Sequence, residues 1–449
     1  MHTLAQLRGG QLHGLKRLDL SAGLTEFPRE IFALADTLEV LNLSGNALTS
    51  LPDDLGRLHR LQVLFCSDNQ FSEVPAVLGQ CPALQMVGFK ANRIRTLPAA
   101  ALTPALRWLI LSDNQLEELP AEIGNCTRLQ KLMLAGNRLT ALPETLANCT
   151  SLELLRIAAN RLTELPTWLL ALPRLAWLAY AGNPFCAQAE VDVTNNKSIT
   201  DIPWNRLAIE EQLGEGASGV IYRARWHRHE AAPEAMAVKL FKGALTSDGL
   251  PQSEMAACIS AGGHPHLIGV AGRVSQHPTQ AQGLVLELIS PSFGNLAGPP
   301  SLATCTRDVY APGTSFTIET VVRTAQGIAA ATQHLHERGI LHGDLYAHNV
   351  LATATGEALL GDFGAASFFS FPDPETSPAW QQLEARAFSC LLEELLAHCE
   401  VSPAAQATVA ALHALRQRCA QPNVAARPFF REITAELARI GQLIAPMRT

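Results

Sequence analysis

The sequence predicts two units of different fold class, an α/β solenoid followed by a unit that mixes strands and helices. Three observations support this division. A pattern of about 23 residues repeats through the first part of the chain, it is lost after Cys186, and a glycine-rich segment flanked by strand-like residues begins at Leu207. We therefore expect a repeat domain at 1–190, a linker at 191–203 and a second domain at 204–449.

The composition is that of a globular protein without a strongly charged partner. The 449 residues exceed what one hydrophobic core holds, and the net charge of −7 gives no basic footprint for nucleic acid. The sequence shows neither a membrane-spanning apolar run nor a signal peptide, so we expect a cytoplasmic protein without a membrane span. The ten cysteines form no CxxC pair, and we expect reduced, mostly buried thiols.

The repeated pattern is LxxLxLxxNxLxxLP. Its asparagines are spaced by 23, 23, 22, 23, 23 and 23 residues, and they are Asn46, Asn69, Asn92, Asn114, Asn137, Asn160 and Asn183. Alternating leucines predict one short strand per repeat, and stacked strands form a parallel sheet. A buried asparagine amide can satisfy backbone groups of adjacent turns. Residues 13–190 resemble leucine-rich-repeat proteins of the intracellular 23-residue type, which implies a horseshoe.

The residues between the buried leucines are expected on the concave face. The third position of successive strands is Val40, Val63, Met86, Trp108, Lys131, Leu154 and Trp177, and the fifth is Asn42, Phe65, Gly88, Ile110, Met133, Arg156 and Ala179. This stripe is more apolar than a solvated face requires, which is typical of an interaction site. We expect a separate protein partner on it. The alternative is contact with the chain's own second domain or with a second copy.

The second domain opens with three glycines, Gly214, Gly216 and Gly219, in the pattern GxGxxG. A dinucleotide-binding fold would need a helix directly after them. The residues that follow, Val220 to Tyr222, favour a strand instead. A hairpin whose glycine backbone closes over the phosphates of ATP fits this pattern better.

Two charged residues follow at a spacing that suits phosphate binding. Lys239 lies in the strand-like segment Met236–Lys239, and Glu254 lies fifteen residues later on a predicted helix. A carboxylate there would fix the ammonium group that holds the α- and β-phosphates. The segment 283–289 then reads as a buried strand running into a hinge whose backbone would pair with adenine.

The catalytic residues follow a predicted helix that ends near Leu335. The chain reads His342-Gly-Asp344-Leu-Tyr-Ala-His-Asn349, and Asp362-Phe-Gly comes thirteen residues after Asn349. Phosphoryl transfer depends mainly on positioning and charge neutralisation. Asp344 would orient the attacking hydroxyl group, while Asn349 and Asp362 would hold magnesium ions.

These segments together resemble the protein kinases over about residues 205–440, and Arg427-Pro-Phe resembles the RPxF of tyrosine-kinase-like members. The resemblance implies an α+β bilobal protein-kinase fold, ATP and Mg²⁺ as cofactors, and transfer of the γ-phosphate to Ser/Thr hydroxyls. It implies Asp344, Lys239 and Glu254 as catalytic residues and Asn349 and Asp362 as metal ligands. The implied nucleotide site comprises Leu213, Gly214, Gly216, Gly219, Ile221, Ala237, Lys239, Glu287 and Ile289.

The chain departs from the kinase pattern in three places. Gly343 replaces the arginine that in the family reads a phosphate on the activation loop, so we expect no loop-phosphorylation switch. Tyr346 replaces the lysine that follows the catalytic aspartate, and His348 is a candidate substitute. The helix expected from Glu384 begins twenty residues after Gly364, about half the usual gap.

These departures leave two alternatives to a protein kinase. One is a catalytically weak pseudokinase that acts as a scaffold. The other is a small-molecule kinase, because His-Gly-Asp without a following lysine also resembles aminoglycoside and choline kinases. The intact Asp-Phe-Gly and the RPxF ending favour a protein kinase.

Overall fold

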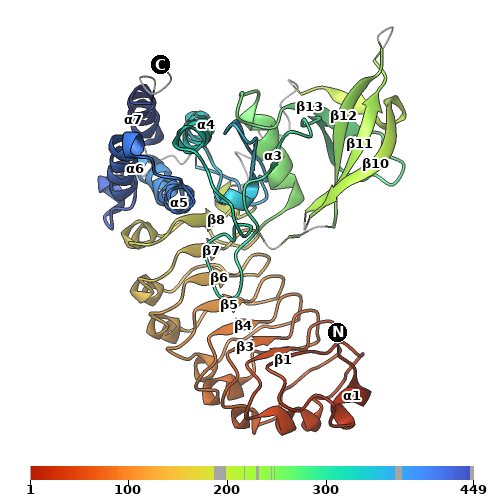
Figure 1. Ribbon diagram of the computed structural model, residues 1–449. Coiled ribbons are helices and arrows are strands. Elements are labelled where there is room, and N and C mark those ends of the chain that lie inside the picture. The colour runs from red at the N-terminus through yellow and green to blue at the C-terminus, as the bar shows by residue number, and fades with distance from the viewer. Residues whose placement is uncertain are drawn as a thin grey trace. The chain divides into compact units, whose positions relative to one another are not determined.

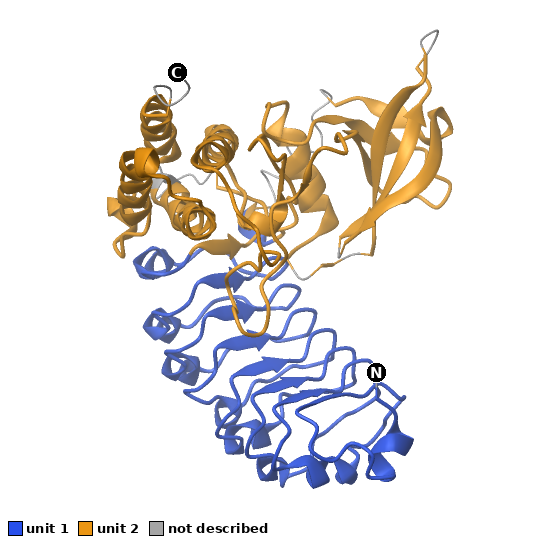
Figure 2. Cartoon of the chain, in the orientation of Figure 1, with its two compact units in different colours: residues 1–175, 183–185 blue, residues 176–182, 186–449 orange. Residues whose placement is uncertain are grey.

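A computed structural model describes residues 2–186, 199–216, 218–228, 232–243, 245–246, 248–369 and 377–444. By their internal contacts, the residues divide into two units (Figure 2). The first comprises Met1–Leu175 and Asn183–Phe185, and the second comprises Ala176–Gly182 and Cys186–Thr449. The segment Ala176–Gly182 therefore groups with the second unit although it continues the repeat pattern. Most of the expected linker lies outside the described residues, and the boundaries at 190 and 204 stay predictions.

The first unit is a parallel solenoid with one short strand per repeat. After helix α1 (Leu4–Arg8), its strands are β1 (Arg17–Asp19), β2 (Val40–Asn42), β3 (Val63–Phe65), β4 (Met86–Gly88), β5 (Trp108–Ile110), β6 (Lys131–Met133) and β7 (Leu154–Arg156). Consecutive strands pair in parallel without a shift of register. The central residue of each strand is buried, as the alternating pattern predicts.

The return path of each repeat is a short 3-10 helix. These are η1 (Arg29–Leu34), η2 (Leu55–Arg57), η3 (Ala76–Gln80), η4 (Ala99–Ala101), η5 (Ala121–Asn125), η6 (Glu144–Asn148) and η7 (Thr167–Ala171). All but η2 have a proline as the residue before their first turn. Proline suits this place because its fixed φ angle favours the turn, and the amide it lacks would have no helical partner there.

The asparagines form the predicted ladder through the interior of the solenoid. The Oδ1 atom of Asn137, for example, accepts from the amide of Leu116 at 3.0 Å, and its Nδ2 atom donates to the carbonyls of Leu111 and Leu134, both at 2.9 Å. The same pattern repeats from Asn46 to Asn183. Each amide thus satisfies backbone groups of two adjacent turns that burial would otherwise leave without partners.

The second unit has a sheet on one side and helices on the other, as Figure 1 shows. After β8 (Trp177–Ala179), the strands are β9 (Asp201–Pro203), β10 (Leu207–Glu215), β11 (Gly219–Trp226), β12 (Glu234–Phe241), β13 (Val270–Ser275), β14 (Gly283–Glu287), β15 (Gly294–Asn295), β16 (Ile340–Leu341), β17 (Val350–Ala352), β18 (Ala358–Leu360) and β19 (Ser367–Phe368). The large sheet has the order β10-β11-β12-β14-β13-β9. The helices are α3 (Pro251–Ala261), α4 (Ile318–Glu337), α5 (Ser377–Ala397), α6 (Gln406–Cys419) and α7 (Phe430–Gln442).

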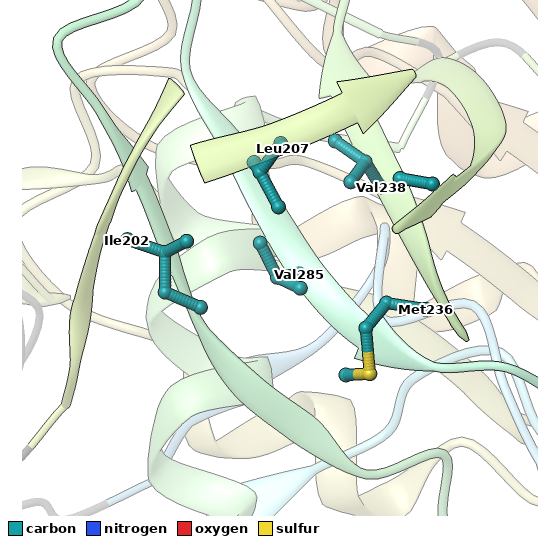
Figure 3. Packing of buried hydrophobic residues seen from close by; sticks show 6 residues of the cluster. Ile202, Leu207, Met236, Val238 and Val285 are labelled. Carbon is teal, nitrogen blue, oxygen red and sulfur yellow. The ribbon is translucent and has the colours of Figure 1, made fainter. Parts of the chain in front are cut away.

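A cluster of buried side chains forms a hydrophobic core at the large sheet. Ile202 on β9 and Leu207 on β10 come from opposite edges of the strand order, yet both pack with Met236, Val238 and Val285 (Figure 3). The last residues of the expected linker, Asp201–Pro203, are thus an edge strand of this sheet. On the helical side, α4 packs against α7, and α5 packs against α6.

The structure confirms the predicted fold class, a leucine-rich-repeat solenoid followed by a kinase-type fold of mixed sheet and helices. The helix that we expected from Glu384 begins earlier, at Ser377. All ten cysteines are free and eight of them are buried, so the expected burial is confirmed. No helix among the described residues combines the length and the apolar character that a bilayer crossing requires.

Candidate active site

The glycine-rich turn joins two antiparallel strands, β10 and β11, as the strand-like flanks predict. A Cβ atom at Gly219 would lie 2.5 Å from the carbonyl oxygen of Leu240, so packing against β12 requires glycine there. A Cβ atom at Gly214 or Gly216 would meet nothing within 4 Å. These two glycines leave the space beside the turn open, and Leu213 next to them is 48% exposed. The turn can therefore accept a group that approaches its backbone.

The lysine on β12 forms an ion pair with the carboxylate on α3. The Nζ atom of Lys239 bonds Oε1 of Glu254, and the two side chains are only 14% and 3% exposed. Burial by itself would lower the pKa of Lys239, but the charges of Glu254 and Asp362 raise it above its ordinary value. The ammonium group therefore stays charged in a largely buried position, which suits it to hold an anion.

The strand that leads to the predicted hinge is central in the sheet. Ala237 on β12 is buried and lies opposite Leu286 on β14, and Ile221 on β11 lies opposite Lys239. The amide of Glu287 donates to the carbonyl of Gly269 at 2.9 Å, so that amide already has a protein partner. Ile289 follows the end of β14.

The loop around Asp344 is held by hydrogen bonds that involve Asn349, His342 and Gly361. Asn349 donates from Nδ2 to the carboxylate of Asp344 at 2.7 Å and to its carbonyl at 2.9 Å. His342 donates from Nε2 to the carbonyl of Gly361 at 2.9 Å, while its Nδ1 accepts the amide of Asp344 at 3.3 Å. The amide of Gly361 in turn donates to the carbonyl of Asn349. The loop is thus tied to the residues directly before Asp362.

Asp362 has a backbone conformation that side chains rarely adopt. Its φ angle is +54°, and its Oδ1 atom accepts the amide of Gly364 at 3.1 Å. Its side chain is exposed, whereas Phe363 is buried beside the ring of His342. Strain of this kind persists only where the surroundings impose it, and it is concentrated at functional sites.

Asn349 and Asp362 are the residues whose oxygens are candidates to hold a magnesium ion. Because the Nδ2 atom of Asn349 donates to Asp344, its Oδ1 atom is the one available for other contacts. Carboxylate and amide oxygens are the ligands that this ion prefers, and it commonly takes its other ligands from phosphates and water. The described residues contain no group of three or more His, Cys, Asp or Glu side chains placed to hold a metal. A metal at this place would therefore depend on the oxygens of a bound nucleotide as well.

Two polar contacts near the loop were not foreseen from the sequence. Asp308 bonds Nδ1 of His348 at 2.8 Å and accepts its amide at 2.9 Å. Burial would lower the pKa of His348, but the hydrogen bond and the charge of Asp308 raise it above the ordinary value. Glu384 on α5 accepts the amide of Gly343 at 2.6 Å and Nε2 of His336 at 2.7 Å. No local sequence signal marks Asp308 or Glu384, because each lies about forty residues from the loop residue that it contacts.

Arg427, near the end of the kinase pattern, is buried and bonds backbone carbonyls. It donates from Nε to the carbonyl of Gln421 at 2.8 Å, and Gln382 donates from Nε2 to the carbonyl of Arg427 at 2.6 Å. Burial, followed by the charge of Arg386, lowers the pKa of Arg427 to about 10. These contacts tie α5 to the turn that precedes α7.

Known protein families match residues in both units of the chain. Residues 207–385 match the family described as protein tyrosine and serine/threonine kinase. Leucine-rich-repeat families match residues 36–77, 104–148 and 127–185.

Curated relatives match part of the chain. Serine/threonine-protein kinase CTR1 of Arabidopsis thaliana is 27% identical over 193 residues, which cover 41% of this chain and 22% of the relative. Serine/threonine-protein kinase pakH of Dictyostelium discoideum is 23% identical over 211 residues, or 43% of this chain and 38% of the relative. Cyclin-dependent kinase 11B of Rattus norvegicus is 27% identical over 183 residues, or 40% and 38%. The matches thus span well under half of each relative, and the chain combines leucine-rich repeats with a protein kinase domain.

Proposed function

We propose that this protein is an ATP- and magnesium-dependent kinase that transfers the γ-phosphate to Ser/Thr hydroxyls of proteins. The observation that carries the proposal is the buried ion pair between Lys239 and Glu254. Burial lowers the pKa of the Lys239 ammonium group, but the charges of Glu254 and Asp362 also act on it and raise its pKa above the ordinary value. A charged lysine is costly to bury unless it has a task or a partner. Here its partner holds it on the central strand β12, close enough to Asp362 for the two charges to interact.

In this proposal each residue of the site has one role. Lys239 binds the α- and β-phosphates, and Glu254 fixes its ammonium group. The glycine turn closes over the phosphates, and the backbone of Glu287 and Ile289 faces the adenine. Asp344 orients the substrate hydroxyl group, and its carboxylate is itself oriented by Asn349. Magnesium held by Asn349 and Asp362 would neutralise charge on the phosphates.

Transfer of label from γ-labelled ATP by the purified full-length chain tests this proposal. Lys239→Ala and Asp344→Asn should each abolish the signal, while Arg439→Ala, which breaks an exposed ion pair on α7, should leave it unchanged. Phosphoamino-acid analysis then separates Ser/Thr from Tyr products. Binding of ATP without any transfer would favour a scaffold, and label found only on small molecules would favour a small-molecule kinase.

We further propose that the repeats bind a protein partner or substrate in the cytoplasm. Within the first unit, Phe65, Trp108, Ile110 and Met133 are partly exposed members of the apolar stripe, and the rings of Phe65 and Trp108 meet edge to face at 6.4 Å. The seventh member of the third position, Trp177, is not available to such a partner, because it is 1% exposed and packs within the second unit.

A further inference from the structure

The segment Ala176–Gly182 contains the strand of the last repeat, β8, but its contacts assign it to the kinase unit. Figure 2 gives it the colour of that unit, while the residues before and after it, Leu175 and Asn183, belong to the solenoid. The segment is almost completely buried, with Trp177 at 1%, Leu178 at 3% and Tyr180 at 0% exposure. A segment that merely ended the repeats would not need such contacts.

The first contact is with the loop that carries Asp344. The indole ring of Trp177 stacks on the ring of Tyr346, with centroids 4.1 Å apart and planes inclined by 7°. Its Nε1 atom donates to the carbonyl of Leu345 at 3.1 Å. Trp177 therefore holds the two residues that directly follow Asp344, through both a stacked ring and a hydrogen bond.

The second contact is with the residues that follow Asp362-Phe-Gly. The amides of Tyr180 and Ala181 donate to Oγ of Ser367 at 3.1 and 3.2 Å, and the hydroxyl of Tyr180 donates to the carbonyl of Phe368 at 3.2 Å. Burial raises the pKa of the Tyr180 hydroxyl far above its ordinary value, so the hydroxyl keeps its proton and remains a donor. Ser367 and Phe368 form β19, which pairs with β16 just before His342. The segment thus contacts both the residues that follow Asp344 and the strand that pairs with the residues before His342.

The third contact explains the glycine at position 343. Its φ angle is +74°, and an added Cβ atom would lie 2.5 Å from the carbonyl oxygen of Ala365 and 2.7 Å from that of Leu178. The backbone of β8 therefore occupies the space that any side chain at this position would need.

We propose that the segment Ala176–Gly182 is part of the phosphotransferase, and that Trp177, Tyr180 and Ser367 are positioning residues that hold the catalytic loop and the start of the activation segment. The inference rests on the proposed kinase function. In kinases with an arginine at the position of Gly343, a phosphate on the activation loop helps to hold the loop in place. We infer that the strand β8 does this here. Ser367, whose hydroxyl is buried in this contact, is accordingly a structural residue and no phosphorylation site.

The test compares the full-length chain with Trp177→Phe, Tyr180→Phe and Ser367→Ala, and with Trp168→Phe as the matched control on η7 of the solenoid. Hydrogen–deuterium exchange should become faster in peptides covering 340–349 and 363–369 of the first three variants, and should be unchanged in α6 and α7. Trp177→Phe and Tyr180→Phe should each lower kcat by about fivefold, the equivalent of one lost hydrogen bond. Ser367→Ala removes the acceptor of two amides and should lower kcat by more than about fivefold. In all three variants KM for ATP should stay within about twofold of the wild-type value. Trp168→Phe should change none of these quantities.

Two results would overturn the inference. One is unchanged exchange in both peptides of all three variants. The other is faster exchange throughout the unit together with equal changes of kcat and KM, since this pattern reports only general destabilisation. If the wild-type chain transfers no phosphate, the kinase proposal fails by itself. The exchange data still decide whether the segment positions the loop.

Discussion

Replacement of Gly343 by alanine adds one methyl group to the catalytic loop where the structure leaves no room for it. The methyl carbon would lie 2.5 and 2.7 Å from two carbonyl oxygens, those of Ala365 and Leu178. These are backbone atoms, so relief requires a shift of the loop, of β8 or of the segment after Asp362-Phe-Gly. The φ angle of +74° adds strain for any residue with a Cβ atom.

The expected cost follows from these two contributions. Placing alanine in the left-handed region costs about 1–2 kcal/mol, and forcing extra atoms into a packed site costs about 1–3 kcal/mol more. Gly343→Ala should therefore destabilise the folded chain by about 2–5 kcal/mol and lower kcat by more than tenfold. Gly313→Ala is the matched control. Its φ angle is +81°, but its Cβ atom would meet nothing within 4 Å, so only the backbone strain applies.

The assay measures Tm and kcat for both alanine variants and for Gly343→Arg, which restores the residue typical of the family. We expect the arginine variant to be at least as damaged as the alanine variant, and its remaining activity to be insensitive to phosphatase treatment. Equal values for Gly343→Ala and Gly313→Ala would refute the steric argument. An active Gly343→Arg enzyme that loses activity on dephosphorylation would show that the loop retains a phosphorylation switch.

Three further predictions concern the solenoid and the helices. Asn137→Ala removes three buried hydrogen bonds and should destabilise the repeats by about 3–5 kcal/mol in denaturant unfolding, whereas Asn46→Ala, at a less buried place, should cost less. Burial, followed by the charge of Asp308, raises the pKa of Glu394 from 4.5 to about 7, so the folded chain keeps a proton there that the unfolded chain has lost. Stability should therefore fall as pH rises from about 4.5 through 7, by at most about 3 kcal/mol. Glu394→Gln should flatten this fall when Tm is measured at pH 5 and pH 8, and an unchanged slope would contradict the assignment. For a protein substrate of the wild-type enzyme, Ile110→Asp should raise KM without changing kcat, and a loss confined to kcat would argue against recruitment by the repeats.

The solenoid could be predicted almost completely because its determinants are local and repeated. Each repeat has the same leucines, the same asparagine and a proline at the same place. A wrong assignment of strand or turn in one repeat is therefore recognised by comparison with the other repeats. The asparagine contacts follow from hydrogen-bond chemistry alone, since a buried turn needs both an acceptor and donors from the next repeat.

The contact between Lys239 and Glu254 could be predicted from spacing, whereas the polar partners of the loop around Asp344 could not. Lys239 and Glu254 are fifteen residues apart, and the strand and helix around them already suggest that they meet. Glu384 and Asp308 reach the catalytic loop from about forty residues away on either side. Which carboxylate meets a given amide across such a distance depends on how whole helices pack, and single-sequence periodicity carries no information about that.

Trp108 and Trp177 show most clearly where the sequence ceases to be informative. Both occupy the third strand position of a repeat, and both are predicted to face the concave side. In the structure, Trp108 is partly exposed beside Lys131, whereas Trp177 is buried against Tyr346. A repeat pattern specifies that a side chain leaves the strand on one face, but it does not specify what covers that face.

The segment Ala176–Gly182 continues the repeat pattern but belongs to the second unit, and this decides how the function of the repeats should be tested. A shortened chain that starts at residue 204 would lack Trp177 and Tyr180 as well as the repeats. Its loss of activity could therefore come from a loosened catalytic loop and would not demonstrate recruitment. Substitutions on the partly exposed stripe, such as Ile110→Asp, leave β8 in place, and only they separate the binding of a partner from the support of the catalytic loop.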